Sequence, residues 1–96
     1  MTKADIVNEI SKSTGIDKST VLTTVETLME VIKKNMINGE NVYLRGFGSF
    51  VIKEKAEKLA RNISKNTTLV IPAHNAPAFK PSKSFAKAVA ENVKVK

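Results

Sequence analysis

Apolar residues recur at helical spacing at the start of the chain. Ile6, Val7 and Ile10 mark one apolar stripe of a helix, so their side chains could face a core. Thr2 and Asp5 are three residues apart just before this stripe, which is the spacing of a capping box. The pattern predicts a short helix that ends at Gly15.

A second helix with a broad apolar face follows. Asp17 is its predicted N-cap, and Asn38 with Gly39 predicts its end after about 20 residues, or ~30 Å. The apolar residues of this segment fall within an arc of roughly 120°. They are Val21, Leu22, Val25, Leu28, Met29, Ile32 and Met36. The first helix is too short to cover this face, so we expect a partner subunit to cover the rest.

Strand and turn residues replace the helical pattern after residue 41. Val42–Leu44 predicts a short strand, and residues 45–48 (RGFG) predict a turn in which each glycine can supply a positive φ angle. Phe47 and Phe50 lie beside the strand residues, which favours packing in a core over stacking on bases. The glycine pair lacks the lysine and hydroxyl residues of a P-loop, so nucleotide binding is not predicted.

The next segment has the character of an extended basic arm. As a strand, residues 51–62 would reach ~40 Å, beyond a compact body. The side chains of Lys53, Lys55 and Arg61 would point to one side of such a strand, whereas that of Lys58 would point to the other side. Either a bulge intervenes or both sides of the arm meet phosphate. Turn-forming residues at 62–66 predict a reversal, and apolar residues 69–71 predict the returning strand.

Prolines follow the returning strand. Pro77 and Pro81 punctuate the exit from that strand, and Ser82 is the predicted N-cap of a final helix with Phe85 on its inner side. Lys83 would stand in the first turn of that helix, where a cation opposes the helix dipole. A bound phosphate would relieve the conflict.

The whole chain has a net charge of +7, and the positive charge is concentrated in its second half. Residues 1–40 hold five basic and six acidic residues, whereas residues 41–96 hold eleven basic and three acidic ones, a net charge of +8. This asymmetry indicates a polyanionic partner, with nucleic acid first and an anionic membrane surface second. A basic face kept only for solubility is the other reading. The basic residues lie mainly on predicted strands rather than on an amphipathic helix, which argues against a membrane surface.

Composition argues against several other classes of protein. Ninety-six residues make one domain with a thin core, and the absence of cysteine excludes disulfides and thiolate metal sites. No run approaches the ~20 apolar residues of a membrane span, and the acid at Asp5 does not suit a signal peptide, so we expect a cytoplasmic protein. His74 is the only histidine and has no partner at ligand or catalytic spacing. We expect no enzyme activity, metal, cofactor or small-molecule substrate.

Several motifs together resemble one known family. They are LRGFGSF at residues 44–50, Arg61 with Asn62, IPA at 71–73 and PAFKPSK at 77–83. In this order and spacing they are similar to the bacterial histone-like HU and integration host factor family. The resemblance covers essentially the whole chain.

The resemblance implies an α+β fold in a single domain of residues 1–96. Residues 1–40 would form a helical dimerisation base, 41–81 a three-stranded antiparallel sheet extended into a β-ribbon arm, and 82–96 a short C-terminal helix. Two such chains would intertwine as a homodimer, or as a heterodimer with a related chain. Their arms would grip double-stranded DNA through the minor groove in the bacterial nucleoid, bending and compacting it with little sequence preference.

The family pattern also implies roles for particular residues. Contacts to DNA would come from Gly46, Ser49, Lys53, Lys55, Lys58, Arg61, Asn62, Ile63, Lys65, Lys80 and Lys83. The dimer core would contain Val25, Leu28, Met29, Ile32, Leu44, Phe47, Phe50 and Phe79.

The tip of the arm departs from the family pattern. Ile63 stands where the family has proline, so it keeps apolar bulk but loses the fixed φ angle. It would either pack against its own turn or act as an apolar wedge between base steps, with Arg61 beside it in the narrow minor groove.

Three other functions remain as alternatives. The chain could be a sequence-preferring subunit like those of integration host factor, an RNA-binding module, or a structural adaptor for acidic proteins. RNA binding lacks an aromatic platform, since Tyr43 is the only tyrosine and the phenylalanines are expected in the core.

Overall fold

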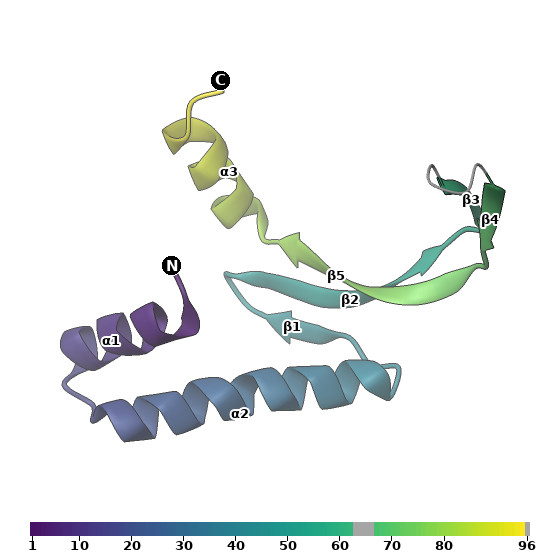
Figure 1. Cartoon of the computed structure of the whole chain (residues 1–96). Helices are drawn as coiled ribbons and strands as arrows, with labels where there is room; N and C mark the ends of the chain where they lie inside the picture. Colours follow the sequence, from purple (N-terminus) through teal and green to yellow (C-terminus); the bar gives the residue numbers. More distant parts are fainter. Residues whose placement is uncertain (63–66, 96) are drawn as a thin grey trace.

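The protein is a helical base joined to a small sheet and a long arm (Figure 1). The computed structural model describes residues 1–62 and 67–95. Both ends of the chain lie on the side of the molecule opposite the arm. The elements are α1 (Lys3–Thr14), α2 (Lys18–Ile37), β1 (Val42–Leu44), β2 (Gly48–Lys55), β3 (Lys58–Asn62), β4 (Thr67–Ile71), β5 (His74–Pro81) and α3 (Lys83–Asn92).

The predicted helix boundaries are confirmed by their caps. The Thr2 hydroxyl accepts a hydrogen bond from the Asp5 N–H, and the Asp5 carboxylate accepts one from the Thr2 N–H, which completes the capping box. Gly15 ends α1 in the left-handed conformation with φ 75°. Asp17 caps α2 by accepting from the Thr20 N–H at 3.2 Å.

Five strands form two antiparallel sheets. The three-stranded sheet has the order β1-β2-β5, and β3 pairs with β4 in a separate two-stranded ribbon. Lys55 pairs with His74 where the β2–β5 ladder ends, and Lys58 pairs with Ile71 where the β3–β4 ladder begins. Residues 56–57 separate the two ladders on the outgoing side of the arm, and residues 72–73 separate them on the returning side. The two gaps have the same length, whereas a bulge would add a residue to one side only. The bulge alternative is wrong, and the α+β fold with a β-ribbon arm is confirmed.

The proline-rich stretch 77–81 belongs to the strand β5. Pro77 pairs with Ile52, and Pro81 pairs with Gly48. β5 is an edge strand of the sheet, so the missing proline N–H groups do not interrupt an interior ladder. The strand ends at Pro81, which agrees with the predicted extent of the sheet and arm, residues 41–81.

The two glycines of the β1–β2 turn have different roles. Gly46 has φ 82°, as predicted, but Gly48 does not have a positive φ angle. A Cβ atom on Gly48 would lie 2.5 Å from the Lys80 carbonyl oxygen and 2.6 Å from Cζ of Phe79. Gly48 is needed because the neighbouring strand and an aromatic ring approach it closely.

A single chain buries very little of its apolar surface. Among the described residues only Val7 and Val21 are buried hydrophobic residues. The accessible surface is 8302 Å², against roughly 5,400 Å² for a folded monomer of this mass. The radius of gyration is 18.6 Å, against about 12.5 Å for a compact chain of this length. The arm explains part of this excess, and exposed apolar residues on the body explain the rest.

Four phenylalanines gather at the end of the sheet from which α3 begins. The ring centroids of Phe47 and Phe79 are 5.1 Å apart, and those of Phe50 and Phe79 are 5.0 Å apart. Phe85 of α3 stacks on Phe47 at 5.5 Å. Such contacts stabilise a core, yet Phe47 is still 47% exposed and Phe79 39% exposed in the single chain.

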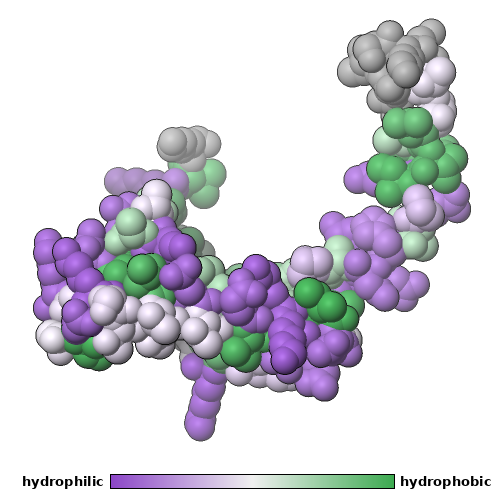
Figure 2. Space-filling model, turned by 60° about the horizontal axis from the view of Figure 1, so that its bottom comes forward, coloured by the Kyte–Doolittle hydropathy of each residue, from purple (hydrophilic) through white to green (hydrophobic). Residues whose placement is uncertain are grey.

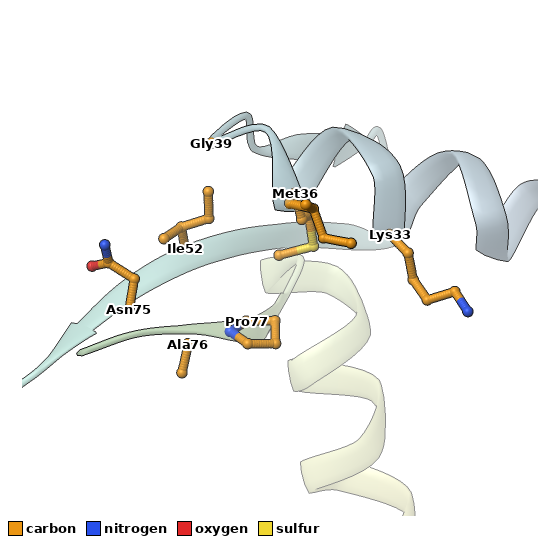
Figure 3. Close-up of a pocket in the computed structure, with 8 residues that line it drawn as sticks. Lys33, Met36, Gly39, Ile52, Asn75, Ala76 and Pro77 are labelled. Atoms are coloured by element: carbon orange, nitrogen blue, oxygen red, sulfur yellow. The ribbon is translucent and has the colours of Figure 1, made fainter. Parts of the chain in front are cut away.

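An apolar groove separates the C-terminal end of α2 from the sheet (Figure 3). It has a volume of about 590 Å³ and is open to solvent. Met36 of α2 lies over the groove, and Ile52 and Pro77 line its sheet side. Together with the half-exposed phenylalanines, this groove is apolar surface that the single chain leaves uncovered.

Candidate nucleic-acid interface

The strand register separates the three-stranded sheet into two faces. Residues that pair directly across antiparallel strands point to the same side, and neighbours along a strand alternate. Ile52 projects towards the α2 side in Figure 3, whereas Ala76, whose partner is Lys53, projects away from it. The apolar face, on the α2 side, carries Val42, Leu44, Gly48, Phe50, Ile52, Glu54, Asn75, Pro77, Phe79 and Pro81. The basic face carries Tyr43, Ser49, Val51, Lys53, Lys55, His74, Ala76, Ala78 and Lys80.

Three of the predicted DNA-binding lysines meet on the basic face. Lys53 and Lys55 are two residues apart on β2, and Lys80 lies on β5 opposite Ser49. The alanines at positions 76 and 78 have short side chains, so they leave a low surface between the lysines. Small side chains between the lysines allow a polyanion to approach the sheet closely.

The basic face has no acidic residue of its own. Glu54 belongs to the apolar face, opposite Asn75. Among the side chains of residues 1–60 and 67–95, the ion pairs are Lys3–Glu26, Lys33–Glu30 and Lys87–Glu91, all between helical residues. The exposed lysines of the basic face are therefore available to an external anion.

Hydrogen bonds tie the β1–β2 turn to the start of α3. The Ser82 N–H donates to the Phe47 carbonyl at 2.9 Å, and the Ser82 hydroxyl donates to the Gly46 carbonyl at 3.1 Å. The same hydroxyl accepts from the Phe85 N–H, which confirms Ser82 as the N-cap of α3. These bonds hold the segment that contains Lys80 and Lys83 against the turn that contains Gly46.

The outer ribbon carries both charge and apolar surface. Lys58 is exposed and pairs with Ile71, so it shares a face with Leu69, whereas Leu59 and Val70 share the other face. Leu59 is 71% exposed, and Figure 2 shows the resulting hydrophobic surface on the arm. The sequence pattern predicted a strand at the apolar run 69–71 but did not indicate that both faces of the ribbon would be apolar. Pairing of Leu59 with Val70 was the missing information.

Of the four residues predicted as DNA contacts at the arm tip, two lie within the described part of the chain. Arg61 and Asn62 lie in β3, where they pair with Thr68 and Thr67. Ile63 and Lys65 lie outside the described residues.

The predicted dimer-core residues remain accessible in the single chain. Leu28 is 48% exposed and Met29 42% exposed on α2. Val25, Ile32, Leu44 and Phe50 are half-buried. A core of this composition needs further apolar surface to exclude water.

Other kinds of site lack support in residues 1–62 and 67–95. None of the helices there has the length and apolar character to cross a bilayer. In the same ranges no three histidine or acidic side chains gather in a way that could hold a metal ion. His74 is exposed, and its ring Nδ1 lies 3.0 Å from the Pro72 carbonyl.

Comparisons with known proteins agree on one group. A family model described as bacterial DNA-binding protein matches residues 1–90. The chain is 33% identical to DNA-binding protein HU of Geobacillus stearothermophilus, over 93% of this chain and 99% of that protein. It is 36% identical to integration host factor subunit alpha of Vibrio atlanticus, over 99% of this chain and 96% of that subunit. Among solved structures it resembles the protein in an Anabaena HU–DNA cocrystal structure, with a TM-score of 0.87, 31% identity, and coverage of 94% and 98% of the two chains.

Proposed function

Because the chain belongs to the family of bacterial DNA-binding proteins, we propose that it binds duplex DNA with the basic face of its sheet and with its arm. The observation that carries this proposal is the meeting of Lys53, Lys55 and Lys80 on one exposed face that has no acid. Phosphate contacts of this kind supply most of the affinity of sequence-independent binding. The role is architectural rather than enzymatic, and it places the protein on the bacterial chromosome in the cytoplasm.

We further propose that the binding unit is a dimer. The half-exposed phenylalanine cluster, the apolar stripe of α2 and the groove beside Met36 supply the surface that a second chain would cover. Sedimentation at micromolar concentration should give twice the mass of the chain, and the melting temperature should rise with protein concentration. A monomer with a concentration-independent melting temperature would contradict this. Mixing with a related chain would separate homodimer from heterodimer formation.

Salt dependence is the direct test of DNA binding. A dimer that neutralises about six phosphates should lose roughly 10³-fold in affinity for a random duplex between 50 and 200 mM salt. Affinity that stays flat over this range would contradict the proposal. Competition with double-stranded RNA of equal length should leave the DNA complex largely intact, because the A-form groove presents a different shape. Equal competition would favour an RNA-binding function.

Bending through the minor groove is the proposed consequence of binding. The apolar residues of the outer ribbon and the predicted wedge at Ile63 suit insertion against base steps. A duplex labelled at both ends should show increased energy transfer on binding, and Ile63→Asp should reduce that increase while folding is retained. An unchanged bend in this variant would show that Ile63 packs against its own turn instead.

Similarity to an integration host factor subunit supports a second candidate, namely binding with sequence preference. We propose little preference, because the basic face offers lysines and small residues but few side chains that read base edges. Selection from a random duplex library should therefore enrich no consensus. Enrichment of a motif by 10³-fold or more would favour the sequence-preferring alternative.

A further inference from the structure

We infer that the hydroxyl of Tyr43 donates a hydrogen bond to a phosphodiester oxygen of bound DNA. This inference rests on the proposed function and adds a neutral donor to a face otherwise identified by its lysines. No feature of the sequence alone singled out Tyr43 as a DNA-binding residue. The signal lies in the register of β1 and in a chain of hydrogen bonds.

Tyr43 stands on the basic face rather than in the aromatic cluster. It pairs with Ser49, which pairs in turn with Lys80, so the three residues form one row across β1, β2 and β5. The Tyr43 side of this row is open, since the residue is 70% exposed. An exposed tyrosine in the same row as a lysine offers an apolar ring for a sugar and a polar tip for a phosphate.

The hydrogen bonds behind Tyr43 leave its proton available. Oδ1 of Asn41 accepts from the Ile52 backbone N–H at 2.9 Å. A backbone N–H can only donate, so the Asn41 amide is held with its NH₂ group on the other side. Nδ2 of Asn41 then donates to Oη of Tyr43 at 3.3 Å. The phenol oxygen acts as the acceptor in this pair, and its own O–H is left to donate to a ligand.

A hollow beside Tyr43 has the chemistry of an anion site. Its volume is about 230 Å³, and its lining residues include Tyr43, Arg45, Ser49, Lys80 and Ser82. Two cationic residues and the hydroxyl residues Tyr43 and Ser49 line this space, whereas the hydroxyl of Ser82 is already used in its bond to the Gly46 carbonyl, and the lining contains no acid. Phosphate oxygens accept from hydroxyl, guanidinium and ammonium donors alike. The Tyr43 O–H therefore has a suitable acceptor once the DNA backbone passes over the row.

Tyr43→Phe tests the inference because it removes only the hydroxyl. Without this hydrogen bond, binding to a random duplex should weaken by about threefold to tenfold, which is the range for the net contribution of a typical hydrogen bond. The slope of log affinity against log salt should not change, since a neutral donor releases no counterion. Lys80→Ala should instead lower that slope by about one for each phosphate that the lysine no longer neutralises. Ser13→Ala, which removes a hydroxyl that donates within α1, should have no effect on binding.

A double-mutant cycle tests the role given to Asn41. If Asn41 acts by orienting the Tyr43 hydroxyl, Asn41→Ala should weaken binding in the wild-type background and have no further effect in the Tyr43→Phe background. Additive losses would show that Asn41 affects binding by another route. Circular dichroism of each variant establishes that folding is retained, and Phe at this exposed strand position should preserve it.

A spectroscopic measurement separates this inference from the proposed function. Tyr43 is the only tyrosine, so selective ¹³C labelling of tyrosine gives ring signals from this residue alone. These signals should shift on addition of duplex DNA and should not shift on addition of sodium chloride to the same ionic strength. If the wild type fails to bind duplex at low salt, the proposed function fails. If it binds but the ring signals and the Tyr43→Phe affinity are unchanged, only the present inference fails.

Discussion

The two faces of the three-stranded sheet share the same strands but have opposite chemistry. Ile52 lines the apolar groove under α2, while its neighbour Lys53 lies on the basic face. Strand alternation permits this, because successive side chains point to opposite sides. The comparison teaches that adjacent residues can serve different tasks: the apolar face holds the fold together, and the basic face is the proposed binding surface. Substitutions on the apolar face should change stability, whereas those on the basic face should change affinity and its salt dependence.

Gly48→Ala should break the apolar face most severely. The added Cβ would lie 2.5 Å from a backbone oxygen of β5, so the β2–β5 ladder would have to open. We expect a loss of about 3 kcal/mol in the free energy of unfolding, at the upper end of the usual cost of overpacking. Denaturant unfolding measures this loss.

Gly46→Ala is the matched control in the same turn. A Cβ at Gly46 would meet nothing within 4 Å, but the φ angle of 82° disfavours alanine. The expected loss is about 1 to 2 kcal/mol, the cost of a left-handed residue with a side chain. Equal losses for the two variants would contradict the account of Gly48 as a close-approach position.

Local features of the fold could be predicted from the sequence. The caps at Thr2, Asp17 and Ser82 and the stops at Gly15 and Asn38 depend on side chains and backbone within a few residues. Those interactions are present in the chain itself and do not need the tertiary fold. The extent of both N-terminal helices followed from them.

Features that depend on pairing between distant strands could not be predicted from spacing alone. The place of Lys80 beside Ser49, the strand character of Pro77 and the tight contact at Gly48 all follow from the register of β2 against β5. A shift of one residue would move every side chain to the other face. Family resemblance supplied the residues of the candidate site, and the register supplied their common face.

Lys53→Ala with Lys55→Ala should remove part of the basic face without affecting the fold. Both lysines are exposed, so stability should change by less than about 0.5 kcal/mol. The salt slope of DNA binding should fall by about two for each chain engaged, because each lysine releases about one counterion. Gel shifts or fluorescence anisotropy at several salt concentrations measure this.

The control removes the same charge from the helices through Lys12→Ala with Lys34→Ala, and it should leave the salt slope nearly unchanged. An equal fall of the slope in both double variants would show that only net charge matters.

Acid should weaken the helical base. Hydrogen bonds from the Thr2 backbone and hydroxyl lower the pKa of Asp5 below its ordinary value of 3.8, and hydrogen bonds from Ser19 and Thr20 lower that of Asp17. A carboxylate with a lowered pKa stabilises the folded state above the ordinary value, and this contribution is lost as the pH falls through the lower, folded pKa. The melting temperature should therefore fall as the pH is taken from 5 to below about 3. Asp17→Asn keeps a good N-cap, so its melting temperature should match that of the wild type near neutral pH and should fall less in acid. An unchanged fall of the melting temperature would contradict the role of Asp17.

Glu54→Gln should have the smallest effect, and it tests how completely the sheet separates its two faces. Glu54 is exposed at the outer end of the apolar face, opposite Asn75, while Lys53 and Lys55 beside it in sequence point to the other side. Solvent and salt screen an exposed charge over about 10 Å at 0.1 M salt, so removing it should raise affinity for duplex DNA by less than about twofold. Ala76→Glu makes the informative contrast, because it places the same charge directly opposite Lys53 on the basic face. This variant should lower affinity by about tenfold or more, because the new carboxylate would neutralise Lys53 and repel the nearest phosphate. If Glu54→Gln strengthened binding as much as Ala76→Glu weakened it, the side of the sheet would not matter, and net charge alone would account for the binding.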